Sequence, residues 1–277
     1  MFWRSPGLVQ TSPVELVLDK ESFSLEELLE EDDVIQECKS LNSRLINFLK
    51  TRPVVEKLVT YMVETPEDDA DAKREFKYPY LACEIFSCEI DAVLSTLVEN
   101  NCELFGKLLS FIDQSGPLNP MLACYFSKTV GCLISRRAGD CMGFLQAHPR
   151  FLDRLVDHVG VLAVAEVLLR LVGADDPGVM PMQGMMMLPS HGGDHSAWLV
   201  DTPLLNRLLD ALGRSSGEDH GEEDDPTVHA NAAEVLVGIA RGAPSALATQ
   251  LAAKQSMRKL FVRGLGDGSR GGPLGYG

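Results

Sequence analysis

The sequence has few aromatic residues and no long apolar run, and both shortages restrict the fold. Aromatic residues make up 6% of the 277 residues, whereas the hydrophobic share is 45% and consists mainly of Leu, Val and Ala. A β-sandwich needs β-branched and aromatic residues in short alternating runs, and such runs are missing. The most apolar stretch, Val159–Val172, contains Glu166 and Arg170 and is too short to span a bilayer. The composition therefore favours helices that pack on one another.

The sequence also lacks clusters of basic residues. The net charge is −15, with acidic runs at 26–33, 64–71 and 218–225, and Lys and Arg do not gather beyond pairs such as Arg136-Arg137. Nucleic-acid backbones and anionic lipid surfaces both require a dense basic surface. We therefore expect no binding to nucleic acid or to membranes.

The cysteine pattern and the N-terminus both indicate a reducing compartment. The chain has seven cysteines, an odd number, with no CxxC motif, and each lies in or beside an apolar helical pattern. Buried free thiols explain this pattern better than disulfides do. The first ten residues contain no apolar run long enough for a signal peptide. We expect a cytoplasmic protein that is also present in the nucleus.

Apolar residues recur at three- and four-residue spacing along most of the chain, which predicts about ten to twelve helices. Ser24 and Glu27 form a capping-box pattern before a short helix, and Asp33 is expected to open a longer helix that reaches Phe48. Asn119 is expected to cap a helix that runs to Ser135. Because no strand pattern is present, the sequence predicts an all-α fold. A globular bundle and a HEAT/armadillo-like helical-repeat solenoid both fit, and we favour the solenoid.

The pattern divides the chain into one helical domain and three less regular segments. The domain covers residues 1–263, with a flexible insertion at 173–197 and an acidic loop at 213–225. Residues 264–277 are rich in glycine and are expected to form a disordered tail. Later helices are expected at 140–147, 149–158, 161–172, 203–212, 226–241 and 244–262, with Gly139 as a stop before the first of them.

Three short motifs suggest chemistry, but each lacks the structural context that the chemistry needs. Gly213–Gly217 matches the GxSxG pattern of hydrolases around Ser215, yet a helix precedes it where a strand is required. Gly266–Gly271 matches GxGxxG but opens no helix. His191 and His195 lie in a Gly/Ser-rich segment without a third ligand. We therefore expect no catalytic residues, no bound metal or cofactor and no small-molecule substrate.

Two features remain as candidates for packing or for contacts with a partner. Ala123, Ser127 and Gly131 form a stripe of small residues, which we interpret as close helix packing within the domain, with a partner helix as the alternative. The aromatic residues around Pro79 are interpreted as a staple that fixes the entry to a helix. Exposed aromatic residues can also anchor an interface, so that alternative stays open.

Several longer segments, in the right order, resemble the SAPS-domain family. They are Met1–Trp3, Leu29–Lys39, Phe76–Pro79 with Ala82–Glu84, Leu118–Ala123 with Phe126–Thr129, Leu168–Val172 and, more weakly, Asn231–Ala233. Members of this family are regulatory subunits that bind the catalytic subunit of protein phosphatase 6 and its close relatives. The resemblance implies that this chain corresponds to the N-terminal part of such a subunit. It also implies a helical-repeat scaffold that directs the phosphatase to substrates, while metals and catalysis belong to the partner.

The resemblance also suggests where the phosphatase binds, because two of its segments combine loop residues with the start of a helix. The expected contact residues are Phe76, Lys77, Tyr78, Pro79, Asn119, Pro120, Lys128, Arg136 and Arg137. A helical-repeat adaptor for an unrelated protein partner, without enzymatic activity, is the alternative function.

Overall fold

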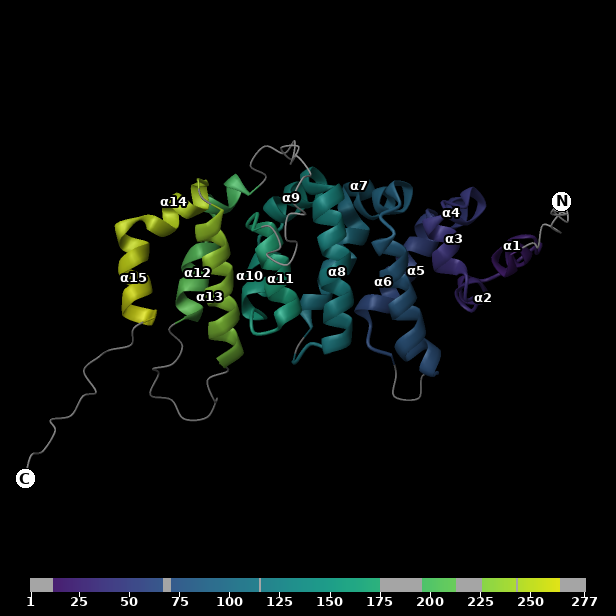
Figure 1. Ribbon diagram of the computed structural model, residues 1–277, viewed down its shortest axis with the longest axis horizontal. Coiled ribbons are helices and arrows are strands. Elements are labelled where there is room, and N and C mark those ends of the chain that lie inside the picture. Colours follow the sequence, from purple (N-terminus) through teal and green to yellow (C-terminus); the bar gives the residue numbers. More distant parts are fainter. Residues whose placement is uncertain are drawn as a thin grey trace, which may run out of the picture. The chain divides into compact units, whose positions relative to one another are not determined.

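The computed structural model describes residues 12–66, 71–114, 116–174, 196–212, 226–242 and 244–264. Within these ranges it contains fifteen α-helices and no strand (Figure 1). The predicted all-α class is therefore confirmed, whereas the repeat character of a solenoid stays a prediction. The helices fall into two compact units, one extending to Phe111 with Ser135–Arg137, the other comprising Ile112–Ile134 and the residues after Arg137.

The first unit is built from short helices around a long one. Its elements are α1 (Pro13–Leu18), α2 (Leu25–Leu29), α3 (Val34–Lys39), α4 (Ser43–Leu49), α5 (Arg52–Val63), the π-helical turn η1 (Lys73–Lys77), α6 (Tyr78–Ser87) and α7 (Asp91–Leu109). Helix α5 packs against both α6 and α7. Its side chains Val55, Leu58 and Met62 are completely buried, so α5 forms the centre of this unit's core.

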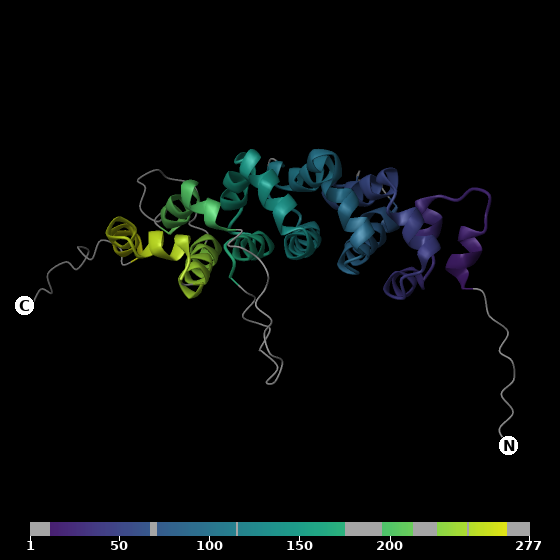
Figure 2. The same cartoon turned by 90° about the horizontal axis from the view of Figure 1, so that it is seen from above.

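The second unit contains the remaining elements, apart from the first half of η2 and the end of α8. They are the 3₁₀ turn η2, which spans Ser110–Asp113, α8 (Pro120–Arg136), α9 (Ala138–Ala147), α10 (Arg150–Asp157), α11 (Leu162–Leu171), the 3₁₀ turn η3 (Ala197–Asp201), α12 (Leu204–Ala211), α13 (Pro226–Arg241), α14 (Ala246–Ala252) and α15 (Lys254–Gly264). Figure 2 shows α13 to α15, coloured yellow-green to yellow, grouped together in this unit.

Helix starts follow the expected capping chemistry at two of the predicted positions. The Ser24 hydroxyl accepts a hydrogen bond from the Glu27 amide, and the Glu27 carboxylate accepts one from the Ser24 amide, which confirms the capping box. The Asn119 side chain accepts hydrogen bonds from the amides of Met121 and Leu122 at the start of α8. Each cap satisfies amide groups that have no partner inside the helix.

The prediction of a single helix from Asp33 to Phe48 is wrong, because the chain forms α3 and α4 instead. Leu41 between them has a φ of 59°, and Asp33 makes no side-chain capping bond. Asn42 caps α4, and its amide donates hydrogen bonds to Glu15, 2.6 Å away, and to Glu37, 3.0 Å away. These bonds stabilise a break that apolar spacing alone does not reveal.

Three other boundaries differ from the predictions. The helix expected at 244–262 is interrupted at Ala253, whose ψ of 144° is extended, and becomes α14 and α15. Gly139, expected as a stop, lies inside α9. Helix α1 was not expected, although Ser12 and Pro13 are typical of a helix start.

The helical spacing of apolar residues in the sequence fails between Leu97 and Leu104, and α7 is interrupted there. Asn100, Asn101 and Cys102 interrupt α7 with φ angles of 49°, 59° and 59°. Asparagine tolerates positive φ better than most residues, so the Asn-Asn pair suits this position.

Helix α11 is largely enclosed by its neighbours in the second unit, as its apolar sequence predicts. It packs against α10 and α13, and its buried residues are Ala163, Val164, Ala165, Val167, Leu168 and Leu171. Ser127 of the small-residue stripe lies 3.2 Å from the Glu166 carboxylate, to which its hydroxyl donates. A Cβ added at Gly131 would meet the Arg170 Nε at 2.9 Å. The stripe therefore packs inside the unit, which confirms that interpretation over a partner helix.

Helix α13 is fixed to the turn between α10 and α11. The Asn231 amide donates hydrogen bonds to the carbonyl oxygens of Val159 at 2.9 Å and Gly160 at 3.1 Å. A Cβ added at Gly238 would lie 2.7 Å from Leu169 Cδ2. Glycine therefore permits the close approach of α11 and α13.

Candidate partner-binding surface

The first predicted contact segment forms an exposed aromatic corner at the junction of η1 and α6. Phe76 and Tyr80 are 50% and 48% exposed, while Pro79 is buried in the first turn of α6. Tyr78 is half-buried, and its hydroxyl donates a hydrogen bond to Glu30, 3.0 Å away. Tyr78 and Pro79 thus fix the entry to α6, as the staple interpretation expects, and Phe76 and Tyr80 remain on the surface.

Glu30 on the C-terminal side of α2 connects this corner to the rest of the first unit. Its carboxylate lies 2.8 Å from the Lys73 ammonium and 3.5 Å from that of Lys77, which also donates to the Glu30 carbonyl oxygen. The hydrogen bond from Lys73, with a further one from Tyr78, lowers the pKa of Glu30. The ionised carboxylate therefore holds both ends of η1.

Glu26 makes an equivalent connection one turn earlier on α2. Partial burial raises the pKa of Glu26, but hydrogen bonds from Lys57 and Tyr61 outweigh it and lower the pKa to about 2. The Tyr61 ring packs 5.3 Å from the Tyr78 ring, centroid to centroid, and the Arg74 guanidinium lies 4.9 Å from the Tyr61 centroid. Glu26, Glu30, Tyr61 and Tyr78 form what we call the tyrosine–glutamate cluster.

The cluster is built for positioning and not for proton transfer. Burial, with a hydrogen bond to Glu30, raises the pKa of Tyr78 to about 12, and burial likewise raises the pKa of Tyr61. At neutral pH the tyrosines are protonated donors and the glutamates are ionised acceptors. A general acid or base needs a pKa near the working pH. The pKa values of these four groups are shifted away from neutral pH. The cluster therefore holds Phe76 and Tyr80 on a rigid base.

The second predicted segment lies on α8. Asn119 caps the helix, Pro120 occupies its first turn, and Asn119, Pro120 and Lys128 are all exposed. Asn119 has a structural role at the helix start, and Lys128 is a surface charge on the following turns. This part of α8 belongs to the second unit, whereas the aromatic corner belongs to the first.

Arg136 and Arg137, at the end of α8, make ion pairs within the first unit. The Arg136 Nε donates to the Glu89 carboxylate at 2.8 Å, and an Arg137 Nη donates to Asp91 at 2.6 Å. We predicted these arginines as partner contacts, and the structure gives them a packing role that the sequence did not reveal. Arg137 also donates to Ser95, so its guanidinium is held on the first turns of α7.

Sequence reasoning missed the acidic half of the tyrosine–glutamate cluster. The run at 26–33 entered the sequence analysis only as part of the net negative charge, but Glu26 and Glu30 each bind a tyrosine and at least one lysine. Their partners lie 31 or more residues away in the sequence. The only local signal was the placement of both glutamates four residues apart on one face of α2.

The motifs that suggested chemistry lie outside the described residues. These are the GxSxG segment around Ser215, Gly266–Gly271, and the pair His191 and His195; most of the insertion at 173–197, the whole acidic loop at 213–225 and nearly all of the tail also lie there. Among the residues that are described, no group of three His, Cys, Asp or Glu side chains is arranged to hold a metal ion. In the same part of the chain, no helix combines the length and apolar character needed to cross a bilayer.

Comparison with known proteins identifies relatives over most of the chain. The family model described as SAPS, SIT4 phosphatase-associated protein, matches residues 130–265. Serine/threonine-protein phosphatase 6 regulatory subunit 2 of Mus musculus is 36% identical over 241 residues, which cover 87% of this chain and 24% of that protein. Regulatory subunit 3 of Gallus gallus is 34% identical over 87% of this chain and 25% of its own length.

A further relative, matched over a shorter stretch, is the extragenic suppressor of kinetochore protein 1 of Schizosaccharomyces pombe, 34% identical over 63% of this chain and 22% of its own length. The chain thus spans about a quarter of the length of these relatives. No solved structure matches it. The family-model match and the long alignments agree with each other, and the chain belongs to the SAPS family.

Proposed function

We propose that this chain is a phosphatase-binding scaffold that binds the catalytic subunit of a phosphatase 6-type serine/threonine phosphatase and directs it to substrates. The observation that carries the proposal is the alignment over 87% of the chain with proteins named as phosphatase 6 regulatory subunits. The pKa of Glu26 is lowered and that of Tyr78 is raised, which suits a positioning role for the tyrosine–glutamate cluster.

We further propose that the aromatic corner contributes to the phosphatase interface. Half-exposed aromatic side chains on a rigid base lose little conformational freedom on binding, and such residues carry much of the affinity of protein interfaces. Phe76 and Tyr80 meet this description, and Lys77 would supply charge at the rim. The seven free cysteines suit a reducing compartment, and we propose that the complex forms in the cytoplasm and nucleus.

The test is binding between the purified chain and a purified phosphatase 6 catalytic subunit, measured by biolayer interferometry. We expect a saturable complex, and we expect the double variant Phe76→Ala, Tyr80→Ala to weaken it about thirtyfold, the effect of losing about 2 kcal/mol at an interface hot spot. Leu16→Ala is the matched control, because Leu16 is 58% exposed in the same unit and belongs to neither predicted segment.

The outcomes separate the two parts of the proposal. If the wild-type chain does not bind the catalytic subunit, the proposed function is wrong. If it binds but the double variant binds as tightly as the control, the function stands and the aromatic corner is not the interface. If mass spectrometry of captured complexes instead identifies an unrelated protein, the chain is an adaptor for that protein.

A further inference from the structure

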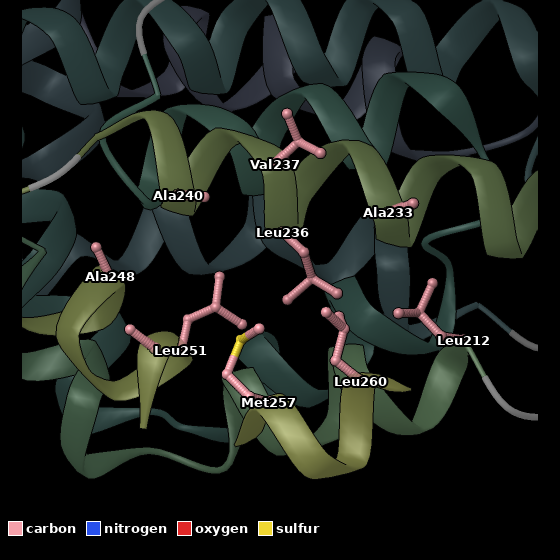
Figure 3. Close-up of a pocket in the computed structure, with 10 residues that line it drawn as sticks. Leu212, Ala233, Leu236, Val237, Ala240, Ala248, Leu251, Met257 and Leu260 are labelled. Carbon is pink, nitrogen blue, oxygen red and sulfur yellow. The ribbon is translucent and has the colours of Figure 1, made fainter. Parts of the chain in front are cut away.

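The second unit contains an apolar groove of about 450 Å³ among α13, α14 and α15, with Leu236, Leu251 and Leu260 in its wall (Figure 3). Among the described residues, its lining has no titratable or nucleophilic side chain, and nothing shows what covers it. The first unit, in contrast, brings two thiols together. Cys38 and Cys88 are far apart in the sequence, yet a hydrogen bond joins their side chains.

The two thiols form a contact between two helices of the first unit. Cys38 lies in the last turn of α3, Cys88 is the residue that follows α6, and these helices pack against each other. Cys38 is completely buried, whereas Cys88 is half-buried. Solvent therefore reaches one member of the pair and not the other.

Both cysteines lie at helix ends, where the backbone can adjust. Leu41 follows Cys38 by three residues and has a φ of 59°, and Glu89 follows Cys88 directly with a φ of 53°. A disulfide needs sulfur atoms about 2.05 Å apart and Cα atoms about 4.4–6.8 Å apart, so two hydrogen-bonded thiols must move closer before they can be joined. Helix ends fray, and α3 is only six residues long, so short segments can supply this movement.

The surroundings of the two thiols give them different chemical roles. The hydrogen bond with Cys88 and burial raise the pKa of the Cys38 thiol, and the nearby Glu37 carboxylate adds to this effect. Cys38 therefore stays protonated at neutral pH and is a poor first nucleophile, because the thiolate is the reactive form of cysteine. A dissolved oxidant meets Cys88 first, since solvent reaches that side chain.

We propose that Cys38 and Cys88 are a site of reversible oxidation by hydrogen peroxide, at which a disulfide clamps α3 to α6. In the first step the Cys88 sulfur attacks a peroxide oxygen, the O–O bond breaks, and Cys88 becomes a sulfenic acid with release of water. The Cys38 sulfur then attacks the Cys88 sulfur, the S–O bond breaks, and the hydroxyl group leaves with the Cys38 proton as water. The two thiols lose two electrons, which the peroxide accepts. The site is independent of the proposed phosphatase interface.

The test uses the full chain, purified with its thiols reduced and then treated with hydrogen peroxide. Remaining thiols are blocked with iodoacetamide, and the chain is cleaved without reduction by trypsin and a glutamate-specific protease. Cleavage after Glu84 and Glu89 separates Cys88 from the other cysteines of α6 and α7, so mass spectrometry identifies the joined pair. We expect the main disulfide to join Cys38 to Cys88, and dithiothreitol to restore all seven thiols by exchange.

Two variants locate the reaction. Cys88→Ser should abolish the disulfide and, because Cys88 is half-buried, keep the wild-type circular dichroism spectrum. Cys124→Ser is the matched control, because Cys124 is exposed in the second unit and its loss should leave the disulfide unchanged. Hydrogen exchange reports the clamp itself. Oxidation should slow exchange of the α3 amides at least about tenfold in the wild-type chain and in Cys124→Ser, but not in Cys88→Ser.

Three results would overturn the proposal. The first is a main disulfide that joins other cysteines. The second is the lack of a bond between Cys38 and Cys88 at every peroxide concentration that preserves the native circular dichroism spectrum, including conversion of Cys88 to a sulfinic acid instead. The third is a disulfide that leaves hydrogen exchange in α3 unchanged, because the bond would then clamp nothing.

Discussion

Replacing Gly238 with Ala tests the close packing of α11 and α13. The added Cβ would lie 2.7 Å from Leu169 Cδ2 and 2.9 Å from the Ala174 Cβ, both closer than real contacts allow. The leucine methyl can rotate away, but the Ala174 Cβ moves only with its backbone. Overpacking of this kind costs about 1–3 kcal/mol, and alanine regains up to about 1 kcal/mol of helix propensity. We expect a net loss of about 1–2 kcal/mol in the free energy of unfolding.

Gly143→Ala is the matched control, because the same chemical change has the opposite expected sign. Gly143 lies inside α9, is exposed, and a Cβ there would meet no heavy atom within 4 Å in the described part of the chain. Only the propensity gain remains, so this variant should stabilise the protein by about 0.5–1 kcal/mol.

The assay is urea unfolding followed by tryptophan fluorescence. The chain has two tryptophans, so a Trp3→Phe background leaves Trp198 of the second unit as the reporter. A local reporter is preferable because two compact units need not unfold in one step. If Gly238→Ala raises the urea midpoint as Gly143→Ala does, α11 and α13 do not pack closely at Gly238.

Other substitutions test single interactions. Asn231→Ala removes two hydrogen bonds to backbone carbonyls and should lower the unfolding free energy by about 1–3 kcal/mol in the same assay; an unchanged midpoint would show that those bonds are not formed. Asn119→Ala removes the cap of α8 and should cost about 1 kcal/mol, with Asn119→Ser retaining most of it; equal loss in both variants would exclude capping. The pKa of Glu26 is lowered to about 2 by Lys57 and Tyr61, so its contribution is complete above pH 5 and is lost as pH falls toward 2. Glu26→Gln should therefore lower the unfolding free energy by about 1 kcal/mol at pH 7. It should also weaken the pH dependence of that free energy between pH 5 and 2, and an unaltered pH dependence would contradict the pairing.

Local signals in the sequence were sufficient for much of the fold. The capping box at Ser24, the cap at Asn119 and the full span of α13 depend on residues within a few positions of each other. The interruption of α7 was also visible, because apolar spacing fails between Leu97 and Leu104.

Two of the errors share a physical cause, which is dependence on distant partners. The break at Leu41 is stabilised partly by the bond from Asn42 to Glu15, 27 residues away. The tyrosine–glutamate cluster joins α2 to tyrosines that follow by 35 and 48 positions. Neither the periodicity of apolar residues nor local propensity carries information over such separations, so the sequence located the aromatic corner but not the base that holds it.

The most direct test of the account is the stoichiometry and activity of a reconstituted complex. The purified chain is mixed with a phosphatase 6 catalytic subunit and examined by size-exclusion chromatography with light scattering, with phosphatase activity measured across the column. The account predicts a one-to-one complex whose activity comes with the catalytic subunit, and no turnover in fractions that contain this chain alone. Separate elution of the two proteins at micromolar concentration, or hydrolysis of phosphate esters by the isolated chain, would contradict it.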